Sequence, residues 1–143
     1  MEPPVLNSAG GEDYVSLSKV LIVDDDQESR SLLCEVLAAN GYAVDAVGDG
    51  LAAREVLSKD GDFRIVIADL QMPKETGLEL LRHLRQQDSK HAIILMSSFI
   101  SATERKMAKE LGAYALLDKP FLLSDLLQAV GELAANNAIG ISS

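Results

Sequence analysis

The 143-residue sequence lacks the features of several protein classes. It has a single cysteine, Cys34, which excludes an internal disulfide and offers no metal-binding cysteine spacing. No apolar run approaches the roughly 18 residues of a membrane-spanning helix. The N-terminal segment has neither a basic start nor an apolar stretch, so it does not resemble a secretory signal. We therefore expect a cytoplasmic protein with no membrane partner.

Basic residues are also few. The chain has 13 Lys and Arg residues against 22 Asp and Glu residues, which gives a formal net charge of −9 at pH 7. A negatively charged protein without a basic stripe repels phosphate backbones, so direct nucleic-acid binding is not expected. The remaining composition, with 48% hydrophobic and 24% charged residues, is ordinary for a soluble globular protein of one domain.

Short apolar segments alternate with helix-length amphipathic stretches. Five segments are strand-like in length and β-branched content: Val20 to Val23, Ala43 to Val47, Ile65 to Ala68, Ile93 to Met96 and Tyr114 to Leu117. A stretch with helical apolar spacing follows each of them, and the first such stripe consists of Leu32, Leu33, Val36 and Leu37. Three turn pairs predict left-handed helix ends: Asn40-Gly41, Asp60-Gly61 and Leu111-Gly112.

Near-continuous apolar strands predict a parallel sheet that is covered on both faces and joined by right-handed crossovers. The expected fold class is therefore α/β, with a single doubly wound, five-stranded parallel sheet. Residues 1–18 and 136–143 are expected to be flexible ends because of their turn-forming and polar composition. This leaves one domain at residues 19–135.

Polar residues follow four of the five predicted strands, at the sheet edge where such folds bind ligands. They are Asp24, Asp25 and Asp26 after the first strand, Asp69 after the third, Ser97 and Ser98 after the fourth, and Asp118, Lys119 and Pro120 after the fifth. Three adjacent carboxylates repel one another unless a cation, a hydrogen-bond donor or water takes their charge. The sequence thus predicts either a solvated cluster or a cation site.

Four segments carry a resemblance to a known family: LIVDDD, IVIADLQMPKETGLELL, ILMSS and LLDKPF. Together they resemble the receiver domain of two-component response regulators, over about residues 19–135. The resemblance implies a flavodoxin-like (βα)5 fold with strand order 2-1-3-4-5. It also implies a signalling domain rather than an enzyme, one that catalyses only its own phosphorylation and slow dephosphorylation.

The resemblance assigns a phosphoacceptor and its helpers. Asp69 would accept a phosphoryl group from the phosphohistidine of a sensor histidine kinase or histidine phosphotransfer protein. Ser97 and Lys119 match the hydroxyl and the lysine that contact the phosphoryl group in this family. General chemistry agrees, because a carboxylate can form an aspartyl phosphate once nearby positive charge and donors offset the repulsion between the two anions.

The resemblance also implies a Mg²⁺ cofactor. Asp25 and Asp69 would bind the ion directly, Asp24 would bind it through water, and the backbone carbonyl of Gln71 would complete the protein ligands. Mg²⁺ prefers oxygen ligands and commonly binds one or two carboxylates together with phosphate oxygens, which fits a cluster of aspartates. The downstream effector, whether a domain or a separate protein, is not identified by the sequence.

Several single residues have simpler interpretations. Asp26 precedes the first helix and is expected to be its N-cap rather than a metal ligand. Cys34 is expected to be a small core residue, and His83 and His91 surface residues. Pro120 follows the lysine where the family has a cis peptide, which proline permits.

Two alternative functions remain open. A haloacid-dehalogenase-like Mg²⁺ phosphatase would use Asp24 as nucleophile in the Asp24-Asp25-Asp26 run, but Glu28 stands where that family has Thr or Val, and the DLQMP segment would be unexplained. A receiver-like interaction module that is not phosphorylated is the other alternative.

Leu116 stands where many receivers have an aromatic ring, which puts aromatic coupling to Ser97 in doubt. Too few residues follow the last predicted helix for an output domain, so we expect a single-domain regulator or part of a longer protein.

Overall fold

The computed structural model describes residues 19–138, and residues 1–18 and 139–143 lie outside the described residues. Of the flexible tail expected at residues 136–143, residues 136–138 instead form the end of the last helix. In chain order the elements are β1 (Lys19–Val23), α2 (Gln27–Ala39), β2 (Ala43–Val47), α3 (Gly50–Lys59), β3 (Ile65–Asp69), α4 (Gly77–Gln86), β4 (Ala92–Ser97), α5 (Ala102–Glu110), β5 (Ala115–Asp118) and α6 (Leu123–Ala138).

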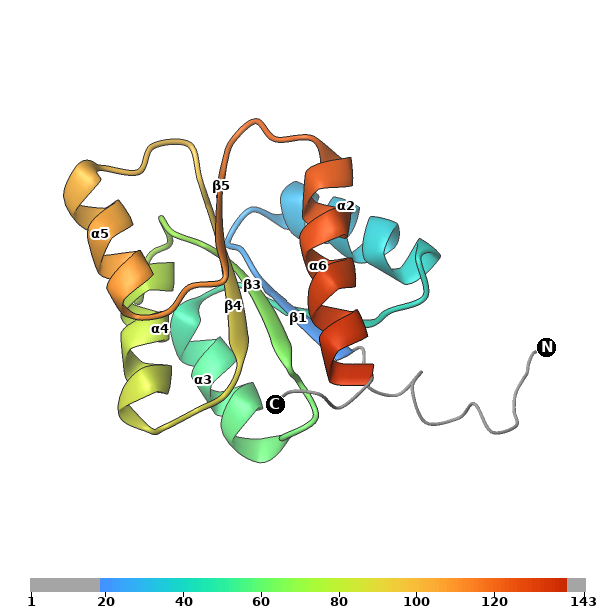
Figure 1. The fold of residues 1–143 in the computed structure, drawn as a ribbon, viewed down its shortest axis with the longest axis horizontal. Coiled ribbons are helices and arrows are strands. Elements are labelled where there is room, and N and C mark those ends of the chain that lie inside the picture. The colour runs from blue at the N-terminus through green and yellow to red at the C-terminus, as the bar shows by residue number, and fades with distance from the viewer. Residues whose placement is uncertain (1–18, 139–143) are drawn as a thin grey trace.

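The five strands form one parallel sheet in the order β2-β1-β3-β4-β5. Helices α2 and α6 cover one face of the sheet, and α3, α4 and α5 cover the other (Figure 1). The predicted α/β fold and strand order are therefore confirmed. The loop after β1 leads to α2 on one face of the sheet, and the loop after β3 leads to α4 on the other face. Because β1 and β3 are neighbours in the sheet, these two loops lie next to each other at its carboxyl edge.

The core follows the apolar pattern of the strands. Every residue of β3 is buried, as are those of β1 and β4 after their first residue. The two outer strands, β2 and β5, are only partly buried because each has one neighbour instead of two. The fully buried strands thus end in the middle of the sheet, where Asp69 and Ser97 are their last residues.

Helix caps fix where the loops at this edge stop. The Asp26 side chain accepts a hydrogen bond from the Ser29 backbone N–H, so Asp26 is the N-cap of α2 as predicted. Thr76 and Ser101 begin α4 and α5 with reciprocal capping boxes. The loop after β3 therefore covers residues 70–76, and the loop after β4 covers residues 98–101.

Some packing predictions were wrong. Leu32, placed on the first apolar stripe, is 48% exposed, because Leu33 and Leu37 alone form the buried side of α2. Gly41 and Gly112 have the predicted positive φ, but α3 ends at Asp60 in an extended conformation, and the following glycine has no positive φ.

Two other predictions held only in part. Cys34 packs against the core from a partly buried position. His91 is half-buried rather than on the surface, and burial lowers its pKa, with the charges of Arg85 and Arg64 acting in the same direction. His83 lies on α4 with its side chain 40% exposed, in line with its predicted surface position.

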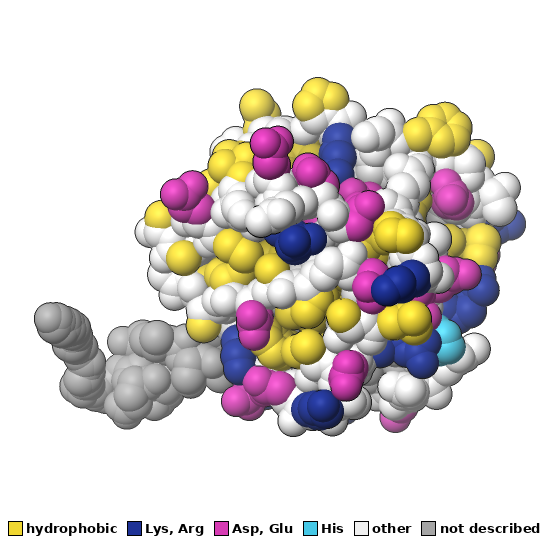
Figure 2. All heavy atoms as spheres, turned by 180° about the vertical axis from the view of Figure 1, so that it is seen from behind, with side chains coloured by type: hydrophobic (Ala, Val, Ile, Leu, Met, Phe, Trp, Pro, Cys, Tyr) yellow, Lys and Arg dark blue, Asp and Glu magenta, His cyan; other side chains and the backbone are white. Residues whose placement is uncertain are grey.

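The surface carries charges of both signs. On the face shown in Figure 2, Lys and Arg side chains lie among Asp and Glu side chains rather than in a basic stripe. Within residues 19–138, no helix is both long enough and apolar enough to cross a membrane.

Candidate functional site

Three carboxylates from two adjacent strands meet at the carboxyl edge of the sheet. Asp24, Asp25 and Asp69 each offer an oxygen, and these oxygens lie within 4.8 Å of one another. Asp24 and Asp69 are buried, whereas Asp25 is exposed. The structure thus brings together the acidic residues that the sequence placed at the ends of the first and third strands.

Asp24 is the most enclosed of the three. Its Oδ1 accepts a hydrogen bond from the Asp26 backbone N–H at 2.9 Å, but its buried Oδ2 has no hydrogen-bond partner among the described residues. The Arg30 guanidinium donates to the Asp24 carbonyl at 2.8 Å, which fixes the backbone here. Burial raises the pKa of Asp24, and the hydrogen bond from Asp26 opposes that shift only in part. A cation at Oδ2 would stabilise the ionised form.

Asp69 is already paired with the side chain of Lys119, the residue that follows β5. The Lys119 ammonium donates to Asp69 Oδ2 at 2.7 Å, and the Gln71 backbone N–H donates to Oδ1 at 2.9 Å. Burial by itself lowers the pKa of Lys119, but the hydrogen bond to Asp69 and the charges of Asp69 and Asp24 outweigh it, so this pKa is raised. Lys119 therefore stays protonated near neutral pH. The peptide bond that precedes Pro120 is cis, as expected.

Ser97 is fully buried at the end of β4, and its hydroxyl forms hydrogen bonds with the loop that follows this strand. The hydroxyl donates to the Phe99 carbonyl at 2.7 Å and accepts from the Phe99 N–H at 3.1 Å. The Gln71 side-chain amide donates to the same carbonyl at 2.9 Å, which links the loops after β3 and β4. The Lys119 N–H donates to the Ser97 carbonyl at 2.8 Å. Ser97 and Lys119 are thus neighbours, but the Ser97 hydroxyl does not contact Asp69.

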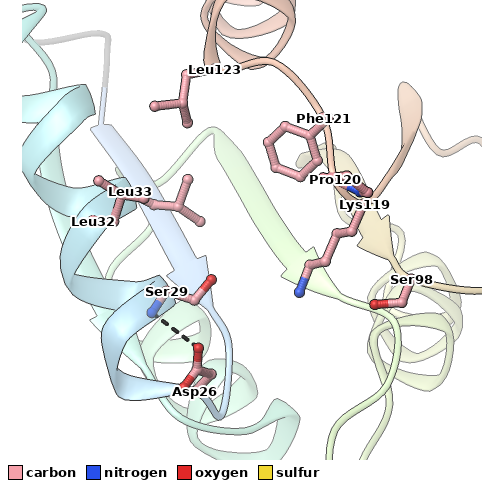
Figure 3. Close-up of a pocket in the computed structure, with 9 residues that line it drawn as sticks. All are labelled: Asp26, Ser29, Leu32, Leu33, Ser98, Lys119, Pro120, Phe121 and Leu123. Atoms are coloured by element: carbon pink, nitrogen blue, oxygen red, sulfur yellow. Dashed lines mark hydrogen bonds between the residues drawn. The ribbon is translucent and has the colours of Figure 1, made fainter.

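The other polar residues at this edge serve different purposes. Asp118 is exposed and pairs with Arg105 of α5 at 3.3 Å, away from the carboxylate cluster. Ser98 faces an open hollow of about 720 Å³ next to Lys119 (Figure 3). This hollow lies between the start of α2 and the segment after β5, and its lining residues are Asp26, Ser29, Leu32, Leu33, Ser98, Lys119, Pro120, Phe121 and Leu123.

The donor set fits a hard divalent cation. Three carboxylates crowd together, two of them buried, and one buried oxygen of Asp24 has no partner in the described part of the chain. Hard cations such as Mg²⁺ take oxygen ligands of this kind and keep several waters. The Gln71 main chain lies against Asp69 through its N–H bond, so it borders the same cluster.

Sequence reasoning missed three side chains around the site. Arg30 was not singled out, although a basic residue one turn into the helix after three aspartates is a usable signal. The contact of the Gln71 side chain with the next loop had no sequence signal. The same holds for Glu75, which is buried against Arg54 in a segment that looked like an ordinary polar turn.

Comparisons with known proteins agree with this geometry. A family model described as the response regulator receiver domain matches residues 20–131. The response regulator MprA of Mycobacterium leprae is 36% identical over 115 residues, which are 80% of this chain and 50% of that protein. The chain thus spans about half the length of the curated relatives it matches.

Solved structures agree as well. The chemotaxis protein CheY4 of Vibrio cholerae aligns with a TM-score of 0.74 at 31% identity, over 80% of this chain and 97% of that one. A response regulator receiver protein from Pseudomonas putida aligns with a TM-score of 0.77 at 30% identity, over 80% and 95% of the two chains.

Proposed function

Because this chain belongs to the response regulator receiver domain family of two-component signalling proteins, we propose that Asp69 accepts a phosphoryl group from a phosphohistidine. The donor is a sensor histidine kinase or a histidine phosphotransfer protein. The observation that carries this proposal is the pairing of Asp69 with Lys119 at 2.7 Å, beside two further carboxylates that are placed to hold a cation. One edge of the sheet thus combines an acceptor oxygen with the charges that offset its repulsion of a phosphoryl group.

The transfer itself is a single displacement. A carboxylate oxygen of Asp69 forms a bond to phosphorus while the phosphorus–nitrogen bond of the phosphohistidine breaks, and its electron pair leaves with the imidazole. Lys119 stays protonated and stabilises the added negative charge on the phosphoryl oxygens.

The metal ligands of this proposal are Asp25 and Asp69 directly, Asp24 through water, and the Gln71 carbonyl. When bound, Mg²⁺ would neutralise charge on the transferring group. The buried Oδ2 of Asp24, which has no partner in the described residues, supports a cation here. Asp24 is 0% exposed against 7% for Asp69, so its carboxylate is the less accessible of the two for attack on a substrate, which disfavours the phosphatase alternative.

Phosphorylation would then change a surface through Ser97. If the Ser97 hydroxyl turns to the phosphoryl oxygens, it gives up its two hydrogen bonds to Phe99, and residues 98–101 must rearrange. Inverting a population from 1:99 to 99:1 needs about 5.5 kcal/mol of differential interaction, which a few charge-assisted hydrogen bonds supply. The switch shifts an existing equilibrium, and the rearranged loop presents a different surface to an effector.

The assignment concerns one domain, which we place at residues 19–135. The activity and partners of the whole protein depend on its effector, which neither the fold nor the site identifies. A cytoplasmic location and the absence of direct nucleic-acid contact remain predictions from the sequence.

Acetyl phosphate with Mg²⁺ tests the acceptor. We expect one phosphoryl group on Asp69, labile to base and absent in Asp69→Asn, whose amide has the same size but is a far poorer nucleophile. The variant Asp25→Ala should lose Mg²⁺ affinity while the fold persists, because removing one crowded carboxylate relieves repulsion. Mass spectrometry that mapped the label to Asp24, or that found it in Asp69→Asn, would favour the phosphatase-like alternative, and no label at all would favour an unphosphorylated interaction module.

A further inference from the structure

The loop from Leu70 to Thr76 joins the acceptor strand to α4, and backbone hydrogen bonds close its base. The Leu70 N–H donates to the Met96 carbonyl of β4 at 2.7 Å, and the Gly77 N–H donates to the Leu70 carbonyl at 3.2 Å. Gln71, whose N–H contacts Asp69, is the second residue of this loop. The position of the Gln71 main chain therefore depends on how the rest of the loop is held.

The far side of the loop contains a buried charge. Glu75 is only 5% exposed, and its Oε1 accepts a hydrogen bond from Arg54 of α3 at 2.8 Å. His83 of α4 has its Nε2 3.5 Å from the same oxygen, while Oε2 is buried with no hydrogen-bond partner in the described part of the chain. A buried carboxylate with so few partners is costly to desolvate, and Arg54 is what offsets that cost.

The start of α3 is shaped to receive this loop. A Cβ on Gly50 would come within 2.9 Å of the Glu75 side chain and of its carbonyl, so the two segments touch because Gly50 has no side chain. Lys74 adopts a φ of 67°, and its ammonium lies 3.5 Å from Asp49, the N-cap of α3. The loop and α3 are therefore in close contact over several residues, and the Glu75 to Arg54 bond lies within that contact.

We propose that Glu75 and Arg54 are a positioning pair for the phosphorylation site: their buried ion pair holds the 70–76 loop against α3 and so keeps the Gln71 main chain against Asp69. The role of this pair rests on the proposed function in one respect: it assumes that Asp69 and Gln71 belong to the metal and phosphoryl site. Neither charged group reaches the acceptor itself, so both act through the loop. Outer partners of metal sites commonly matter in this way, because they orient the groups that bind.

Mg²⁺ titration of the metal-free protein, followed by the backbone amide NMR signals of residues 69–77, tests the pair without phosphorylation. Glu75→Gln keeps the shape of the side chain and removes its charge, and Arg54→Leu removes the partner. Each should raise the Mg²⁺ concentration for half-saturation about tenfold, the lower end of the effect of such outer partners. Arg54→Lys should stay close to wild type, because a single donor contacts Glu75 and an ammonium can replace it.

A second readout separates positioning from loss of structure. The rate of Asp69 phosphorylation by acetyl phosphate should fall in Glu75→Gln at limiting Mg²⁺ and return to the wild-type value at saturating Mg²⁺. The matched control is Glu55→Gln, because Glu55 forms an exposed ion pair with Lys59 on the same helix, 3.4 Å long, and it should leave both values unchanged. If the pair acts as a unit, the effects of Glu75→Gln and Arg54→Leu should not multiply in the double variant.

Three results would overturn the proposal: wild-type Mg²⁺ affinity in both single variants, multiplicative effects in the double variant, or a rate that stays low at saturating Mg²⁺. Failure of the proposed function would look different, because wild-type protein itself would then show no Mg²⁺ binding at Asp69 or no phosphorylation there. The two failures are distinguished in the wild-type measurement alone.

Discussion

Two loops leave the candidate site from adjacent strands, and they are held in opposite ways. The 70–76 loop after β3 buries Met72 and Glu75 and is closed at its base by backbone bonds. The 98–101 loop after β4 leaves Phe99 69% exposed, and its contacts with the site are hydrogen bonds to Ser97 and Gln71. The first loop is anchored mainly by buried side chains. The second has one partly buried apolar side chain against the core, Ile100, and is otherwise held by a few polar bonds.

The difference separates two tasks of one site. A loop that supplies fixed groups to a metal and an acceptor must keep its geometry, and burial against α3 and the sheet provides that. A loop that reports phosphorylation must rearrange at low cost, and segments with few buried contacts open with the smallest free energy. We therefore call residues 70–76 the anchored loop and residues 98–101 the open loop, and the variants below test whether the contrast is real.

The largest effect should come from the buried side chain of the anchored loop. Met72→Ala removes most of a side chain that is 7% exposed and packs in the core on the face of the sheet covered by α3, α4 and α5. Truncations of this kind cost about 2–5 kcal/mol of unfolding free energy, because they leave a cavity. Urea unfolding measures the loss. A cost below about 1 kcal/mol, as at exposed sites, would mean that this loop is not anchored by packing.

A close backbone approach at the end of the anchored loop should give the next largest effect. A Cβ on Gly77 would lie 2.6 Å from the Asp69 carbonyl oxygen, which belongs to the main chain and cannot turn away. We expect Gly77→Ala to destabilise the fold by about 1–3 kcal/mol, as overpacking does, and to weaken Mg²⁺ binding by displacing Asp69. Denaturant unfolding and Mg²⁺ titration measure both effects.

The control for this variant is Gly61→Ala. A Cβ at Gly61 meets no atom within 4 Å, so stability and metal affinity should stay near wild type. Equal effects of the two substitutions would contradict the steric explanation for Gly77.

How far the sequence predicted this contrast depends on the kind of interaction. The strands, their parallel order and the edge where Asp24, Asp69 and Lys119 gather follow from apolar periodicity and from a resemblance carried by short motifs. Hydrogen bonds between residues close in sequence were also predictable, as the N-cap role of Asp26 shows. These features depend on neighbours in sequence or on strand ends.

The anchoring of the loops was not predictable in the same way. Glu75 and Arg54 are 21 positions apart, and neither differs in its local sequence from a solvated surface residue. Leu32 is the opposite case. Its spacing in the sequence matches a buried apolar stripe, but its side chain is exposed in the hollow that Phe121 also lines. Which polar residue is buried, and which apolar residue is not, depends on how distant elements pack.

The open loop should respond to loss of its polar bonds. Ser97→Ala removes the hydroxyl that donates to and accepts from Phe99, at about 0.5–1.5 kcal/mol for each bond. Hydrogen exchange of residues 97–111 should quicken, while residues 70–77 keep their protection. With a beryllofluoride phosphoryl mimic, wild-type protein should change protection over residues 97–111, and Ser97→Ala should not.

Ser98→Ala is the matched control, because Ser98 is the exposed neighbour of Ser97 and lines the hollow instead of bonding its own loop. It should respond to the mimic like wild type. Unchanged protection of residues 97–111 in wild-type protein, or a normal response of Ser97→Ala, would remove Ser97 from the switch.

The smallest effect on stability should come from the apolar side chain at the tip of the open loop. Phe99 bonds Ser97 and Gln71 through its backbone, which Phe99→Ala retains, and its ring is mostly exposed. The unfolding free energy should therefore change by no more than about 0.5 kcal/mol, and Mg²⁺ affinity should not change. Met72→Ala also removes a large apolar side chain, from the neighbouring loop. Urea unfolding of both variants under the same conditions therefore compares the loss of a buried side chain with the loss of an exposed one. If Phe99→Ala destabilised the protein as much as Met72→Ala, the open loop would be anchored too, and phosphorylation would have to break packing rather than exchange hydrogen bonds to move it.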